Sequence, residues 1–233
     1  MASATRIRWS KRLWCHTFQR VRHLPGNGAQ PLIAVAPEGR SVLRVVLRAA
    51  LVSSVVLALV LVELTSRSGV TWRLITFTYQ ANLLAAAYYA WTLASPKADV
   101  RAGLRGAVVL YVVVAGLIWN VFLTEHSMGY TPANLLLHFV VPALALADWL
   151  LIGRGAPPVR WWQPFAWLAY PAAYGVVALV VLNRVGRRAP YFFLDPASVG
   201  ITAVAANVGL LALGILVLGF VLLAFTRVPP ANA

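Results

Sequence analysis

The stretch AVAANVGLLALGILVLGFVLLAF, from Ala203 to Phe225, contains no charged residue and decides the fold class. A helix rises 1.5 Å per residue, so about 20 apolar residues cross the ~30 Å of hydrocarbon in a bilayer. This stretch is therefore long and apolar enough to span a membrane. We expect an all-α membrane protein, a bundle of six transmembrane helices. The five earlier apolar segments run from Leu43 to Leu64, Leu74 to Ala94, Leu104 to Leu123, Ala133 to Ile152 and Phe165 to Leu182.

The composition agrees with lipid as the main solvent. Hydrophobic residues make up 61% of the chain and charged residues 11%, with a mean hydropathy of +0.76. These values exclude a water-soluble surface. The formal charge is +14, yet the basic residues cluster in the N-terminal region and at the ends of the apolar segments. That distribution indicates membrane lipids as partners and no nucleic acid, and it favours the cell membrane as the location.

Three regions follow from this pattern. Residues 1–42 form a basic tail that is either disordered or lies on the membrane surface, 43–227 form the six-helix domain, and 228–233 form a short C-terminal tail. With the N-terminus inside, fifteen of the 20 Lys and Arg residues fall on the cytoplasmic side. Cytoplasmic loops carry an excess of Lys and Arg, so we expect both termini in the cytoplasm.

Polar side chains inside the apolar segments are costly in lipid and therefore informative. Thr78 and His138 each lie about five residues into their segments, ~7 to 8 Å below the outer boundary. Thr78 and Asn82 are four residues apart and share one helix face, whereas Thr76 and Gln80 lie on nearly the opposite face. The two helices can therefore present polar groups to each other at one depth.

Further polar groups lie toward the same outer side, and each has a structural interpretation beside a functional one. Asn134 is stacked with His138, and Asn120 lies near the outer end of the third segment. Thr commonly bonds to its own helix backbone, and Asn or Gln commonly joins helices. Asp148 is near the inner end of the fourth segment, where its carboxylate can reach the interface.

Familiar signatures of catalysis are missing from the chain. There is no G-x-S-x-G, no H-E-x-x-H and no phosphate-binding glycine loop. The six acidic residues are scattered, and only His126 and His138 lie outside the basic tail. We therefore expect no metal and no redox cofactor. The single cysteine, Cys15, excludes an internal disulfide.

Several runs taken together resemble a known group of membrane proteins. The first run is Phe77-Thr78-Tyr79-Gln80-Ala81-Asn82-Leu83-Leu84. The second extends from Asn134 to Pro142 and is followed by Asp148-Trp149. The others are Tyr170-Pro171 and the run from Pro190 to Pro196. They resemble the bacterial Pr-six-Pr integral membrane proteins. The Pr-six-Pr proteins in turn look similar to the eukaryotic androgen-induced-gene family of six-helix threonine hydrolases, which act on fatty acid esters of hydroxy fatty acids. The likeness covers roughly residues 43–226.

The resemblance implies a threonine nucleophile on the second helix and a histidine on the fourth. His138 fits directly, whereas two anchors in the family pattern lead to Thr78 or to Thr76. We favour Thr78 because Asn82 shares its face. His138 would take the threonine proton, and Asn82 or Gln80 would donate to the oxyanion.

Three points stay open: the substrate-binding groups, the group that orients His138, and the class of function. The substrate-binding groups beside the pair would include Asn120 and Asn134. The group that orients His138 would be Glu125, Asp195 or a backbone carbonyl. The alternatives to a lipid-ester hydrolase are a small-molecule or proton transporter and a non-catalytic membrane scaffold.

Overall fold

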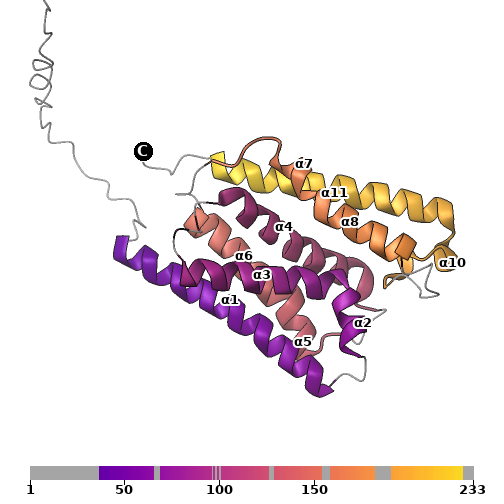
Figure 1. The fold of residues 1–233 in the computed structure, drawn as a ribbon, viewed down its shortest axis with the longest axis horizontal. Helices are drawn as coiled ribbons and strands as arrows, with labels where there is room; N and C mark the ends of the chain where they lie inside the picture. The colour runs from indigo at the N-terminus through magenta and orange to yellow at the C-terminus, as the bar shows by residue number, and fades with distance from the viewer. Residues whose placement is uncertain are drawn as a thin grey trace, which may run out of the picture. The chain divides into compact units, whose positions relative to one another are not determined.

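The computed structural model describes residues 37–65, 69–95, 97, 99, 101–125, 129–153, 158–181 and 190–227. The regular secondary structure of these residues is helical throughout (Figure 1). The expectations for residues 1–36 and for the C-terminal tail lie outside the described residues. The helices, with π-helical turns η2, η3, η4 and η6, are α1 (Pro37–Thr65), α2 (Val70–Ile75), α3 (Phe77–Ala94), α4 (Ala102–Ile118), η2 (Trp119–Leu123), α5 (Pro132–Leu135), η3 (Leu136–Val140), α6 (Val141–Ala147), η4 (Asp148–Ile152), α7 (Gln163–Trp167), α8 (Ala169–Val176), η6 (Val177–Val181), the 3-10 turn η7 (Phe192–Leu194), α10 (Pro196–Val199) and α11 (Ile201–Arg227).

Four helical stretches among the described residues are long and apolar enough to cross a membrane. They are Ser41–Thr65, Ala102–Leu123, Pro132–Ile152 and Ile201–Thr226, and they coincide with the first, third, fourth and sixth expected segments. These helices are consistent with a membrane protein. The second and fifth expected segments also form helices, but each is interrupted, at Thr76 and at Leu168.

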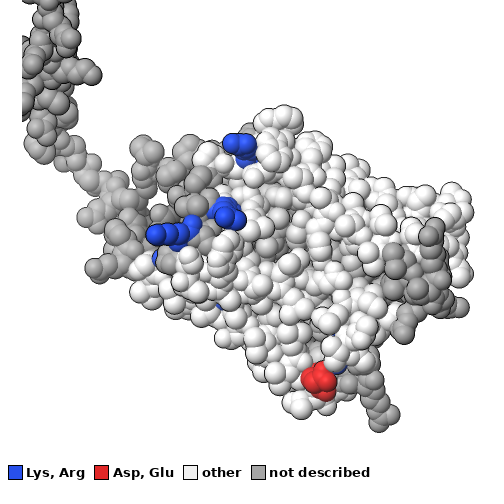
Figure 2. All heavy atoms as spheres, viewed as in Figure 1, with Lys and Arg blue, Asp and Glu red and all other residues white. Residues whose placement is uncertain are grey.

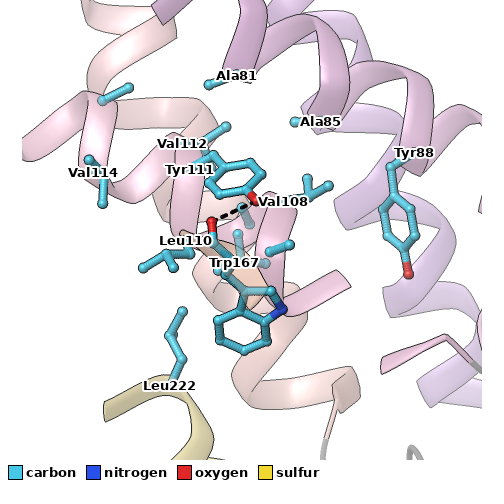
Figure 3. Packing of buried hydrophobic residues seen from close by; sticks show 14 of the residues in the cluster. Ala81, Ala85, Tyr88, Val108, Leu110, Tyr111, Val112, Val114, Trp167 and Leu222 are labelled. Carbon is cyan, nitrogen blue, oxygen red and sulfur yellow. Dashed lines mark hydrogen bonds between the residues drawn. The ribbon is translucent and has the colours of Figure 1, made fainter. Parts of the chain in front are cut away.

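The interruption at Leu168 precedes Pro171, which lies inside α8. Proline has no N–H, so it leaves the carbonyl four residues earlier without its helical donor. That carbonyl belongs to Trp167, and the Tyr111 hydroxyl of α4 donates to it at 2.9 Å (Figure 3). A side chain from another helix therefore replaces the missing backbone bond.

Helix α4 occupies the centre of the bundle. It packs against α3, α6, α7 and α11, while α1 packs against α3 and α6 on the other side (Figure 1). Its buried residues lie all around its circumference. A helix that is apolar on every face is typical of such a central position.

Two indole groups join α4 and its neighbours to the last helices. Trp167 Nε1 donates to Gly103 O at 2.9 Å, and Trp149 Nε1 donates to Leu222 O at 3.1 Å. Gly106 allows the Trp167 ring to pack against α4, since a Cβ at Gly106 would lie 2.5 Å from that ring. These bonds satisfy the polar ends of large apolar side chains and fix where α7 and α11 pack.

The outward surface of the bundle is largely apolar. Side chains such as Val56, Val60, Leu210 and Leu213 are between 49% and 66% exposed. Figure 2 shows Lys and Arg gathered at the end where α1 begins, with mostly uncharged residues over the rest of the described surface. Such an exposed apolar surface is costly in water and suits contact with lipid.

Candidate functional site

The break between α2 and α3 places a helix start inside the bundle. Thr76 adopts an extended conformation between the two helices, and its hydroxyl donates to Arg73 O at 2.8 Å. The Gln80 amide reaches back to donate to Leu74 O at 2.8 Å. The Gln80 amide thus satisfies a carbonyl that the interrupted helix would otherwise leave without a donor, whereas Arg73 O also accepts from the Thr76 N–H at 3.0 Å.

The first amides of α3 have no partner within the helix, and one of them bonds to a distant tyrosine. The Thr78 N–H donates to the Tyr191 hydroxyl oxygen at 3.4 Å. Burial raises the pKa of Tyr191, so this side chain is a neutral phenol at physiological pH. The start of α3 is therefore capped by a hydroxyl from the segment that precedes η7.

An apolar cavity of about 370 Å³ lies beside this helix start. Residues of α3, α4, α8, η6, η7 and α11 form its wall, and no charged residue is among those described there. Its polar side chains are Thr78, Tyr174 and Tyr191. A volume of this size falls in the range of small-molecule sites, which are mostly apolar with a few placed polar groups.

The cavity reaches the outer surface of the bundle. Val176 and Val180 belong to its wall and are 58% and 44% exposed. These residues lie on α8 and η6, where the surface is otherwise apolar. In a membrane, a lipid chain could enter at this side without crossing a polar layer.

His138 lies in η3, is buried, and is not part of the cavity wall. Its ring stacks on Trp119 with centroids 4.7 Å apart. Its Nδ1 lies 3.3 Å from the carbonyl oxygen of Ala115, a residue that does line the cavity. A carbonyl only accepts, so Nδ1 carries the proton and Nε2 is the basic nitrogen of the neutral ring.

Asn82 joins the helix of Thr78 to the helix of His138. Its Nδ2 donates to Thr78 O at 2.9 Å and lies 3.5 Å from Leu137 O. Pro142 follows the π-helical turn η3 and has no N–H that could donate to a carbonyl of that turn. The Asn82 amide therefore supplies a donor to Leu137 O. Among the hydrogen bonds of the described residues, none joins Thr78 to His138 directly.

The other polar residues singled out from the sequence bond mainly to backbone near them. Asn120 donates to Gly116 O at 2.8 Å, and Asn134 donates to Gly129 O at 2.7 Å. Gln80 has a partner farther away, because the Tyr170 hydroxyl donates to its Oε1 at 2.6 Å. Asp195 caps α10 by accepting from Ala197 N. Of the three candidates to orient His138, the backbone carbonyl is the one seen in contact with it.

Sequence reasoning missed a buried ionic cluster at the opposite end of the bundle. Asp148 does not reach the interface: it is 1% exposed, and Arg48 Nε donates to its Oδ1 at 2.8 Å. Arg48 also bonds to Asp99 at 2.9 Å, and Arg105 lies 3.7 Å from Asp148. The signal was present, because Arg48 lies inside the first apolar segment and a charge there requires a partner.

Sequence reasoning also gave no role to Tyr174 and Tyr191. No metal-binding group of His, Cys, Asp and Glu occurs within the described part of the chain. Comparison with known proteins adds nothing to this geometry: no family model, no curated protein and no solved structure matches this chain.

Proposed function

We propose that this protein is a lipid-ester hydrolase of the cell membrane, with six membrane spans, both termini in the cytoplasm, and Thr78 as its nucleophile. One observation carries the proposal: the threonine singled out by helical depth and by resemblance lines an apolar cavity that opens on the lipid-facing surface. An ester linkage has its acyl chain in hydrocarbon, so a nucleophile at the wall of such a cavity can meet the carbonyl carbon while the chain stays in an apolar environment.

The reaction is an acyl transfer through a covalent intermediate. The Thr78 oxygen attacks the ester carbonyl carbon and its proton passes to His138 Nε2. The carbon–oxygen bond to the alcohol then breaks, and the alcohol leaves with that proton. Water, deprotonated by His138 in turn, releases the fatty acid and restores the threonine.

Two contacts support His138 as the base. The Ala115 carbonyl fixes the ring in the tautomer whose Nε2 can accept a proton. The Asn82 amide bridges the backbone at Thr78 and Leu137 and so ties the two helices together at this depth. Proton transfer from Thr78 requires the imidazole and the hydroxyl to approach more closely than in the substrate-free arrangement, in which neither bonds to the other.

Labelling by a fluorophosphonate probe and turnover of a long-chain fatty acid ester test the proposal in the purified full chain. We expect Thr78→Ala to abolish both, Thr78→Ser to retain labelling, and His138→Ala to lower turnover about 10²- to 10⁴-fold. Thr76→Ala is the matched control, because Thr76 bonds to Arg73 O and is outside the cavity wall. Equal labelling of wild type and Thr78→Ala contradicts Thr78 as the nucleophile, and loss in Thr76→Ala alone moves the assignment to Thr76.

A further inference from the structure

Three hydrogen-bonding groups converge at the polar end of the cavity, and one of them lacks a partner. The Tyr174 side chain is 7% exposed and its hydroxyl makes no hydrogen bond of normal geometry. Its ring packs against the ring of Tyr191, with centroids 6.3 Å apart, and the Tyr191 hydroxyl in turn accepts from the Thr78 N–H. A buried hydroxyl without a partner is uncommon, because desolvation costs about 1 to 3 kcal/mol when no bond replaces water.

The three groups suit an acceptor oxygen in a ligand. A phenol donates its proton, and the start of α3, an 18-residue helix, carries a partial positive charge from its aligned peptide dipoles. Among its described residues the wall includes no Lys, Arg or His that would balance the double charge of a phosphate. An ester carbonyl or a carboxylate fits these donors better.

The remainder of the cavity suits one hydrocarbon chain. Apart from the three polar side chains, the described part of its wall is apolar, and the cavity ends at the exposed Val176 and Val180. At about 30 Å³ for a group the size of a water molecule, 370 Å³ holds on the order of a dozen such groups. That is room for one acyl chain.

We propose that Tyr174 and Tyr191 hold the carbonyl end of a single-chain acyl lipid at the start of α3, with the chain in the cavity. The inference rests on the proposed function for the identity of that group as an ester. When Thr78 attacks the ester, the negative charge develops on the oxygen that the two phenols hold. Tyr174 and Tyr191 then stabilise the oxyanion, in place of the amides of Asn82 and Gln80, which bond to backbone carbonyls.

Direct binding tests this inference without requiring turnover. The probe is cis-parinaric acid, a fluorescent fatty acid, added to the purified full chain in lipid nanodiscs, with protein-free nanodiscs as background. We expect saturable binding that methyl palmitate displaces and hexadecane does not. Tyr174→Phe and Tyr191→Phe each remove one hydroxyl and keep the ring, so each should weaken binding about 5- to 10-fold.

Cavity-filling variants keep the test independent of the two hydroxyls. A Cβ at Gly175 meets nothing within 4 Å, so Gly175→Leu adds bulk at the cavity wall without a backbone clash. We expect it to abolish binding. Ala212→Phe fills the same cavity from α11 and should do so as well. Gly209→Leu is the matched control, because Gly209 is equally open but is not part of the wall.

The outcomes separate this inference from the proposed function. Wild-type affinity in both phenylalanine variants, or in both cavity-filling variants, overturns the inference, as does displacement by hexadecane as strong as by methyl palmitate. If fluorophosphonate labelling and turnover persist in the phenylalanine and cavity-filling variants, the hydrolase proposal stands without the acyl site. If binding is saturable and follows the expected pattern but the protein shows no turnover, the result supports the acyl site and contradicts the hydrolase proposal.

Discussion

The Asp148 carboxylate is surrounded by arginines in a part of the bundle that water hardly reaches. Arg48 and Asp148 are each 1% exposed, Arg105 contacts the same carboxylate, and Asp99 pairs with both arginines. Asp148 Oδ2, Arg105 Nε and the hydroxyl of Tyr89 are buried without a hydrogen-bond partner. Polar atoms left in this state usually bind internal water, so we expect ordered water within the cluster.

Removing one carboxylate from this cluster should destabilise the protein strongly. Asp148→Ala leaves Arg48 without its closest partner in a low-dielectric setting, which costs about 3 to 5 kcal/mol. Thermal unfolding in detergent should show a lower midpoint temperature. The matched control is Glu63→Gln, since Glu63 pairs with Arg73 but its side chain is 64% exposed, and exposed pairs contribute about 0 to 1 kcal/mol.

The double variant Arg48→Met with Asp148→Leu distinguishes a charge effect from loss of packing. Replacing both partners by apolar side chains leaves no unpaired charge between them, so the double variant should be more stable than Asp148→Ala. Equal midpoints for Asp148→Ala and Glu63→Gln would contradict the role assigned to the buried carboxylate.

At the scale of the helices, the break at Thr76 determines where the candidate site forms. An unbroken helix through residues 70–94 would bond its own amides and leave Tyr191 no N–H at Thr78. The break is held from two directions: the Gln80 amide donates to Leu74 O, and its Oε1 accepts from the Tyr170 hydroxyl of α8. Gln80 therefore couples the start of α3 to a second helix that lines the cavity.

A double-mutant cycle at Gln80 and Tyr170 measures this coupling. Tyr170→Phe should cost about 0.5 to 1.5 kcal/mol, because it removes one hydrogen bond and keeps the ring packing. Gln80→Met should cost more, since it also leaves Leu74 O without a donor. In unfolding experiments the pair should show an interaction energy of about 0.5 to 3 kcal/mol. Strictly additive losses would mean that the two side chains act independently.

At the scale of the whole chain, the proposed topology can be tested from the two sides of the membrane. On a Cys15→Ser background, cysteines at Gly69 and Tyr130 should react with an impermeant reagent added outside intact cells, and cysteines at Lys97 and Trp161 should not. All four positions are exposed, so accessibility within the fold does not bias the comparison. The reverse pattern would invert the topology, and labelling of Gly69 together with Lys97 would remove the span formed by α3.

The sequence by itself determined the helical class, the four long apolar helices and the shared face of Thr78 and Asn82, because each depends on residues that are neighbours along the chain. Hydropathy over about 20 residues and a spacing of four residues are local quantities. The structure agrees within a few residues at helix ends and shows the Asn82 amide bonded to Thr78 O.

Only the tertiary structure decided which distant groups meet. A charge in an apolar segment reveals that it needs a partner, but Arg48 finds Asp148, 100 residues away, through the packing of α1 against α6 and η4. Likewise, Tyr174 and Tyr191 reach the start of α3 only because the chain breaks at Thr76 and α8 packs nearby. Local patterns specify which faces are apolar, whereas the geometry of helix packing determines which of those faces come into contact.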